Sequence, residues 1–160
     1  MAYPHTSNWD FLVGILAKWA IGAEVTFWAK DTLFTVPLFG AWLRWLGGRP
    51  VARHTPQGAV VQMIETLRQA RTQGRRLWLA LAPEGTRGPG AGWRTGFYRV
   101  AHEAGVPVGL VYFDFARRRV GFDSHWQLSG DIEADCAVFA TRYAPYSGCR
   151  PELAAPVRPI

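Results

Sequence analysis

The first candidates for chemistry are a histidine and an aspartate close to the start of the chain. His5 and Asp10 are separated by four residues. On one straight helix, residues five apart lie about 140° apart at ~100° per residue, so these two side chains would not share a face. They can meet only if His5 lies in a loop and Asp10 lies in the first turn of a helix. Ser7 or Asn8 is a natural N-cap for that helix.

Such a pair could supply a general base. The positive end of the helix dipole favours the ionised form of Asp10. Its carboxylate can hold one imidazole N–H, so that the other ring nitrogen of His5 accepts a proton. This is the logic of a catalytic triad whose nucleophile comes from the substrate. A capped helix start with an incidental histidine fits the same residues. A metal site is disfavoured, because no Cys or second His lies at ligand spacing.

A second group of candidates, Glu84, Gly85, Thr86 and Arg87, directly follows an apolar run over residues 77–82. We expect that run to be a strand covered on both faces. Ligands of open α/β sheets gather outside the carboxyl ends of the strands. Gly85 allows close backbone approach, Thr86 offers a hydroxyl, and Arg87 offers a fork for phosphate. A solvated turn with a structural Glu–Arg pair is the alternative.

Two further cations are predicted at strand ends. Lys30 comes just after an expected strand over residues 24–29, and Arg53 ends an expected short strand over residues 50–53 that follows Gly47 and Gly48. Each alone is typical of a surface charge. Together with Arg87 they would form a cationic pocket beside the His5–Asp10 base.

The elements that would position these residues alternate along the chain. Strands are predicted over residues 24–29, 50–53, 77–82 and 106–115, with a hairpin or edge strand over 118–128. Helices are predicted over 10–21, from Pro56 (with Thr55 as N-cap) to just before Gly74, over 97–104 and over 131–143, with short helices over 33–46 broken at Pro37.

This alternation predicts a single α/β domain with a mostly parallel sheet flanked by helices. The domain is expected to span residues 1–146. A Pro-rich C-terminal tail over residues 147–160 follows it, with a frayed end over 151–160.

Composition narrows the class of partner. The chain has 160 residues and a formal net charge of +6, and all its cationic residues except Lys18 and Lys30 are Arg. This balance favours an anionic partner. The Arg residues are spread along the chain, with one run at 117–119, which disfavours nucleic acid. The longest apolar stretch, 11–29, is interrupted by Lys18 and Glu24, and the start lacks the features of a signal peptide, so neither a transmembrane helix nor export is expected.

In this order, the blocks at residues 5–10, 48–53, 84–87 and 106–108 resemble the glycerolipid acyltransferase family, the PlsC-like group of 1-acylglycerol-3-phosphate acyltransferases, and its small bacterial members in particular. The resemblance runs from about residue 4 to residue 115. A His-x4-Asp motif followed by Glu-Gly-Thr-Arg is much more specific than either motif alone.

The resemblance implies transfer of an acyl group from acyl-CoA or acyl carrier protein to a hydroxyl of a lysophosphatidate-like acceptor. His5 would be the base and Asp10 would orient it, with no covalent enzyme intermediate. Glu84, Gly85, Thr86 and Arg87 would bind the acceptor, and Arg53 would help to contact its phosphate. No metal or organic cofactor is implied. The expected place of action is the cytoplasmic face of a membrane, peripherally bound to an anionic surface.

Some positions depart from the family pattern. Arg49 stands where an apolar residue is usual, Ala52 where Asp is common, and Leu110 where a proline is expected. These changes leave the catalytic pair intact and bear on the choice of acceptor. Because the chain begins only four residues before His5, its first strand is expected to be absent or truncated.

Residues 33–46 are a candidate for membrane attachment, because Trp42 and Trp45 flank Arg44 in a strongly apolar segment. A core helix fits the segment equally well. Trp19, Trp28 and Trp78 are expected in the core. Two other functions stay open: a thioesterase or hydrolase that uses the same His–Asp pair, and a non-catalytic basic module that binds membrane or RNA.

Overall fold

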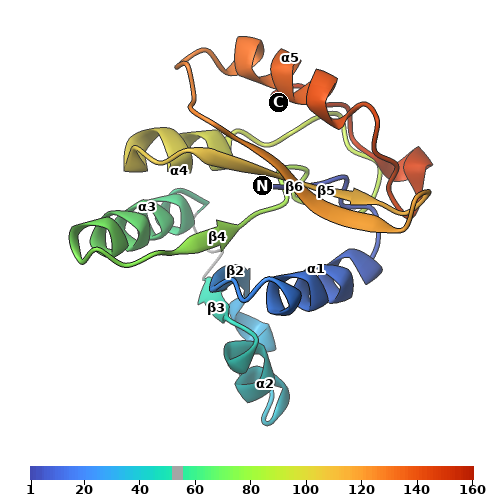
Figure 1. Cartoon of the computed structure of the whole chain (residues 1–160). Coiled ribbons are helices and arrows are strands. Elements are labelled where there is room, and N and C mark those ends of the chain that lie inside the picture. Colours follow the sequence, from blue (N-terminus) through green and yellow to red (C-terminus); the bar gives the residue numbers. More distant parts are fainter. Residues whose placement is uncertain (52–55) are drawn as a thin grey trace.

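Two three-stranded sheets form the centre of the molecule in the computed structural model, which describes residues 1–51 and 56–160 (Figure 1). One sheet has the order β1 (Ala2–Tyr3), β5 (Val108–Asp114) and β6 (Arg119–Trp126), and the other has the order β3 (Gly48–Val51), β2 (Val25–Lys30) and β4 (Trp78–Ala80). Strands pair in parallel except β5 with β6, which are antiparallel. The predicted α/β class with a mostly parallel sheet is confirmed.

A backbone hydrogen bond joins the two sheets. The N–H of Ala2, in β1, donates to the carbonyl of Leu81, just after β4, at 2.9 Å. Three residues further along each segment, the backbone N–H of His5 meets the side chain of Glu84. The ends of β1 and β4 therefore point to the same edge, and that edge carries the first two groups of predicted site residues.

Within the described residues, five helices and two short 3-10 helices surround the strands. Their bounds are α1 (Trp9–Ala20), α2 (Phe39–Trp45), α3 (Pro56–Thr72), α4 (Gly96–Ala104) and α5 (Ile132–Tyr143), with η1 (Asp31–Leu33) and η2 (Pro151–Leu153). Helices α5 and α1 lie on opposite sides of the β5–β6 ribbon (Figure 1). Helix α4 ends at Gly105, whose positive φ of 65° allows the left-handed turn that closes a helix. No helix within the described ranges combines the length and apolarity needed to cross a bilayer.

The main core lies between α4, α5 and the β1–β5 pair. Trp93, Leu110 and Phe139 are completely buried, and Trp93 stacks with Phe139 at a centroid distance of 6.2 Å. Tyr3 of β1 packs edge-on against Trp93, at 5.1 Å between ring centroids. The short first strand is therefore anchored by its aromatic side chain as well as by its ladder with β5.

The C-terminal residues pack against this core, so the expectation of a frayed end is wrong. Ala155 is buried, and its carbonyl accepts a hydrogen bond from the hydroxyl of Tyr3. Pro159 forms a parallel bridge with Trp93, and Ile160 N–H donates to the Trp93 carbonyl. The tail stays ordered because it covers Trp93, a large apolar surface that would otherwise meet water.

Other differences concern the strands and the exposure of two tryptophans. The segment over residues 77–82 is not covered on both faces, and Trp78 is 42% exposed. Its neighbour β1 has only two residues and reaches no further than Leu81, so Trp78 instead packs against Phe122 and His125. Trp19, also expected in the core, is 49% exposed on the outer side of α1. Strand β3 begins at Gly48 rather than at residue 50.

Three expectations about the ends of elements have different outcomes. A strand, β1, does precede His5, although it is only two residues long. The predicted N-cap Thr55 lies outside the described residues. Asp131 is the N-cap of α5, where its carboxylate accepts hydrogen bonds from the N–H groups of Glu133 and Ala134.

Asp135, in the first turn of α5, ties three other segments together. Its carboxylate accepts hydrogen bonds from the Tyr98 hydroxyl at 2.7 Å, the Trp126 indole N–H at 2.9 Å and the Ser129 backbone N–H at 2.9 Å. Burial alone would raise the pKa of Asp135, but these donors hold the pKa below its ordinary value. The fully satisfied carboxylate fixes α5 against α4 and β6.

Asp135→Asn should lower the free energy of unfolding at pH 7 by about 2–3 kcal/mol, because an amide nitrogen replaces one acceptor among buried donors. A lowered folded-state pKa stabilises the protein above the unfolded pKa of this group, and the contribution is lost as the pH falls through the folded pKa. The variant should therefore lose less stability on acidification than wild type does. Urea denaturation measures both effects. Asp131→Asn is the control, since Asn also caps helices well. Equal losses in the two variants would contradict this role of Asp135.

Candidate functional site

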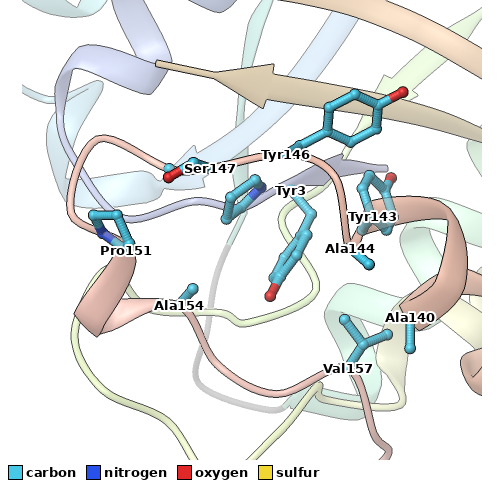
Figure 2. A pocket seen from close by; sticks show the side chains of 11 residues that line it. Tyr3, Ala140, Tyr143, Ala144, Tyr146, Ser147, Pro151, Ala154 and Val157 are labelled. Carbon is cyan, nitrogen blue, oxygen red and sulfur yellow. The ribbon is translucent and has the colours of Figure 1, made fainter. Parts of the chain in front are cut away.

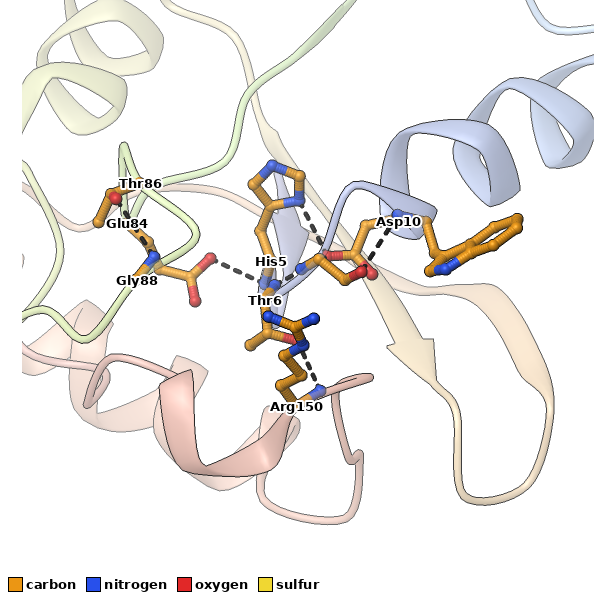
Figure 3. A network of polar contacts seen from close by, with 9 residues as sticks. His5, Thr6, Asp10, Glu84, Thr86, Gly88 and Arg150 are labelled. Atoms are coloured by element: carbon orange, nitrogen blue, oxygen red, sulfur yellow. Dashed lines mark hydrogen bonds and ion pairs between the residues drawn. The ribbon is translucent and has the colours of Figure 1, made fainter.

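His5 lies in the loop between β1 and α1, and Asp10 lies in the first turn of α1, as the sequence predicts (Figure 3). The Nδ1 atom of His5 is 3.2 Å from Oδ2 of Asp10. The Asp10 side chain is fully buried, whereas that of His5 is 21% exposed. The structure therefore brings the predicted pair together, with the carboxylate inside and the imidazole at the surface.

The same carboxylate oxygen also folds the loop. Oδ2 of Asp10 accepts hydrogen bonds from the backbone N–H groups of Thr6 and Ser7, each at 2.8 Å. The predicted N-cap arrangement is confirmed only in part: Asn8 occupies the N-cap position without a side-chain cap, and Ser7 Oγ accepts from the N–H of Trp9 at 3.2 Å. Oδ1 of Asp10 is buried and accepts no hydrogen bond from the described residues.

This geometry selects one tautomer of His5. Because Nδ1 faces an acceptor-only carboxylate, Nδ1 carries the proton and donates it, which leaves Nε2 as the basic nitrogen. The ring nitrogen that is not bonded to Asp10 points away from the carboxylate in Figure 3. No hydroxyl or thiol of the described residues is hydrogen-bonded to it. The arrangement supplies a base and leaves the nucleophile to another molecule.

Glu84 contacts the His5 loop from the opposite side. Its Oε2 accepts a hydrogen bond from the backbone N–H of His5 at 2.9 Å, and its side chain is buried. Burial raises the pKa of Glu84 to about 7, against the opposing influence of the N–H groups of His5 and Ala155 and the nearby His5 side chain. Glu84 thus joins β4, the His5 loop and the C-terminal segment.

The C-terminal segment supports the loop at a second point, which sequence reasoning missed. Thr6, almost completely buried, accepts through its Oγ1 a hydrogen bond from the N–H of Arg150 at 3.1 Å (Figure 3). Gly148 sits so close to Thr6 that a Cβ there would lie 2.7 Å from Thr6 Oγ1. The only sequence signal for this contact was Thr6 itself, a small polar residue beside the histidine.

The remaining residues of the Glu84 turn are exposed. Gly85 has a φ of +68°, a conformation that favours glycine, and a Cβ there would lie 2.8 Å from Cδ of Arg94. Thr86 Oγ1 accepts from the N–H of Gly88 at 3.2 Å, which shapes the turn. Arg87 and Arg94 are both exposed, and Arg94, which the sequence did not single out, lies against the turn.

The other two predicted cations are not joined to this network. Lys30 is exposed at the carboxyl end of β2, and within the described ranges no contact links it to His5, Asp10 or Glu84. Arg53 lies outside the described residues. Among the described residues, the cations at the Glu84 turn are Arg87 and Arg94, and the predicted cationic pocket stays a prediction.

A cavity of about 200 Å³ lies behind the loop (Figure 2). Tyr3 and Pro4 line it on one side, and α5 and the C-terminal segment line it on the other, through residues that include Tyr143, Ser147 and Val157. Neither His5 nor Asp10 lines it, so it does not enclose the catalytic pair. Within the described residues, no three His, Cys, Asp or Glu side chains are grouped closely enough to hold a metal ion. That the site works without a metal or cofactor stays a prediction.

Comparison with protein-family models matches residues 1–113 to the acyltransferase family. The match spans more than half of the chain and includes the His5 loop, the Glu84 turn and most of β5. The chain therefore belongs to the acyltransferase family, in its PlsC-like glycerolipid group. Strand β6, α5 and the C-terminal segment lie beyond the matched residues. No curated protein and no solved structure gives a significant match.

Glu84→Gln should flatten the pH dependence of stability. Because the folded-state pKa of Glu84 is raised from 4.5 to about 7, its contribution is fully present below the unfolded value and is lost as the pH rises through the folded value. The loss is on the order of 3 kcal/mol for a group shifted this far. Denaturation at pH 5 and pH 8 measures it.

Thr86→Ala, in the same turn, is the control, because it removes no titrating group. If wild type and Glu84→Gln lose the same stability between pH 5 and pH 8, Glu84 does not titrate as a buried carboxyl.

Proposed function

We propose that this acyltransferase moves a fatty acyl group from a thioester donor, acyl-CoA or acyl carrier protein, to a free hydroxyl of a lysophosphatidate-like glycerolipid. The family match supports acyl transfer in general. The observation that carries the mechanism is the His5 imidazole held at Nδ1 by the buried Asp10, with Nε2 free of any protein nucleophile among the described residues.

The chemistry follows from that geometry. Nε2 of His5 takes the proton of the acceptor hydroxyl as its oxygen attacks the thioester carbonyl carbon. The tetrahedral intermediate then collapses, the C–S bond breaks, and the departing thiolate receives the proton from the imidazolium. The products are an ester and a free thiol. The Asp10 carboxylate stabilises the imidazolium that exists between the two proton transfers and keeps the ring in one orientation.

The two parts of the Glu84 turn would have separate tasks. Arg87 and Arg94 are the cations that would bind the phosphate of the acceptor, and Gly85 and Thr86 would let it approach the backbone. Glu84 itself is buried and bonded to the N–H of His5. We therefore assign it to positioning the His5 loop rather than to direct contact with the acceptor. Lys30 and Arg53 stay candidates for the same anion.

The proposed reaction requires no resident cofactor, since the thioester of the donor is already activated. An acceptor with one acyl chain and one phosphate is found at a membrane, so we place the enzyme peripherally on the cytoplasmic face of an anionic bilayer. Nucleic acid is not a proposed partner. These assignments extend the family match and rest on the charges and the His–Asp geometry described above.

Asp10→Asn should lower kcat by about 10²–10⁴-fold, the usual contribution of general acid–base catalysis. Asparagine keeps the size of the side chain but cannot stabilise an imidazolium through its charge. The measurement is the initial rate with acyl-CoA and a lysophospholipid, with circular dichroism to confirm the fold. Thr35→Val, which removes an exposed hydroxyl on the segment before α2, is the control. Unchanged activity in Asp10→Asn would refute the role assigned to Asp10.

A panel of acceptors distinguishes transfer from hydrolysis. Labelled acyl-CoA and labelled acyl carrier protein are each supplied with lysophosphatidate, other lysophospholipids and no acceptor, using wild type and His5→Ala. We expect labelled phospholipid from wild type only, and faster thioester consumption when a lyso-acceptor is present. Thioester cleavage at the same rate with and without acceptor would identify a hydrolase. Equal product from His5→Ala would remove the proposed base.

A further inference from the structure

Helix α1 exposes a continuous apolar stripe. Trp9, Leu12, Leu16 and Trp19 are all exposed. They recur at intervals of three, four and three residues, so at ~100° per residue they fall within an arc of about 80° on one side of the helix. Other positions of the helix pack inward: Ile15 is buried, and the ring of Phe11 lies 5.1 Å from that of Phe27 in β2. Helix α1 therefore already packs against the core through other residues, and the stripe is a further apolar surface that the core does not cover.

Helix α2 extends this surface. Its rings of Phe39 and Trp42 are exposed and lie 5.6 Å apart, and Trp45 is 71% exposed. The rings of Trp45 and Trp19 meet edge-on at 5.5 Å, so the apolar surface runs without a break from α1 to α2. We call this surface the α1–α2 face. It consists of Trp9, Leu12, Leu16, Trp19, Ile21, Leu38, Phe39, Trp42 and Trp45.

Hydrogen bonds on the inner side of the α1–α2 face fix its two helices relative to each other. The ammonium group of Lys18 donates to the carbonyls of Leu46 at 2.6 Å and Val25 at 3.3 Å, which ties α1 to the end of α2 and to the start of β2. Gly47 packs against the same carbonyl of Val25. The two helices therefore keep a fixed relation to each other in the part of the chain that carries the face.

Leu38, at the start of α2, is unusual in two respects. It is 87% exposed, and its φ of +62° and ψ of −52° place it at the centre of a γ-turn, in which the N–H of Phe39 donates to the carbonyl of Pro37 at 2.6 Å. This conformation is rare and strained for a residue with a side chain, and glycine adopts it more easily. The side chain of this strained leucine packs against little of the protein and is exposed to solvent. An apolar side chain held there at a conformational cost points to a partner at this position.

The charges of the face select the kind of partner. The two helices carry only one carboxylate, Asp10, and it is buried, so they expose no negative charge. Arg44, the one charged residue of α2, is exposed and lies over the ring of Phe34, 5.4 Å from its centroid. Half of the chain's eight tryptophans are exposed on this face. Tryptophan beside arginine suits the depth of lipid headgroups, where a ring is half in water and a cation meets phosphate.

We propose that the α1–α2 face lies on an anionic lipid bilayer, with its tryptophan and leucine side chains inserted at headgroup depth. Trp9 begins α1 directly after the His5 loop, so docking brings the base to the membrane surface. A lipid acceptor would then present its hydroxyl without leaving the bilayer. Docking through this face goes beyond the proposed acyl transfer and is measured without any substrate.

The test is sedimentation of the full chain with phosphatidylcholine–phosphatidylglycerol vesicles and with pure phosphatidylcholine vesicles. Wild type should bind the anionic vesicles more tightly. Leu16→Glu, in the middle of the stripe, should weaken binding by about tenfold or more, because it replaces inserted apolar surface with a charge. Val61→Glu is the matched control, since Val61 is exposed to a similar extent on α3, away from the face, and it should leave binding unchanged.

Leu38→Gly separates docking from folding. Glycine relieves the strain of the positive φ, so this variant should be at least as stable as wild type while it binds vesicles more weakly. Equal binding by wild type, Leu16→Glu and Leu38→Gly would overturn the proposal. So would a wild-type dimer in the absence of lipid that Leu16→Glu dissociates, because the face would then be a contact between two copies.

Activity assays keep this test distinct from that of the proposed function. Leu16→Glu should lose activity toward an acceptor held in vesicles and keep it toward a water-soluble, short-chain acceptor. If no acceptor is acylated by any variant but vesicle binding follows the pattern above, the acyl-transfer proposal fails and the docking proposal stands.

Discussion

The structure of the site depends on one buried carboxylate oxygen, Oδ2 of Asp10. Two backbone N–H groups and one imidazole nitrogen converge on it from the same loop. A loop that donates three hydrogen bonds to a fixed acceptor has little conformational freedom, so the imidazole is held in place before any substrate arrives. Because Asp10 is part of α1, the same oxygen also sets where that helix begins, and with it the direction of the exposed α1 stripe.

A second carboxylate, Glu84, acts on the backbone rather than on the imidazole. The two acidic groups thus hold His5 from two sides, one through Nδ1 and the other through the main-chain N–H. Their negative charges repel each other, and the Asp10 charge contributes to the raised pKa of Glu84. The arrangement stays compact because both groups accept hydrogen bonds from backbone N–H groups. These hydrogen bonds offset the free-energy cost of burying a carboxylate.

Local patterns in the sequence predicted most of the elements and the catalytic pair. The spacing of His5 and Asp10 required a loop followed by a first helical turn, and turn residues such as Gly105 marked where helices end. What periodicity could not reveal was which surfaces are covered. Trp19 and Trp78 lie in regular elements but remain exposed, since burial depends on neighbours far along the chain.

The same limit explains the C-terminal segment. Its prolines suggested a loose end, yet Arg150 and Ala155 bond to Thr6, Glu84 and Tyr3, all of them near the other end of the chain or in its middle. No local signal encodes a partner some 150 residues away. The family match ends at residue 113, so these supports lie in a part of the chain that the shared pattern does not describe.

The pairing of β1 with β5 has a consequence for synthesis. Ala2 lies opposite Val111, so the first strand has no ladder partner until residue 111 has left the ribosome. The contacts of Thr6 and Glu84 with residues 150 and 155 come later still. Because pairings of such long sequence separation form slowly and last, the base is assembled only after residue 155 has been translated. A nascent or prematurely terminated chain would therefore expose its tryptophans without carrying an organised catalytic loop.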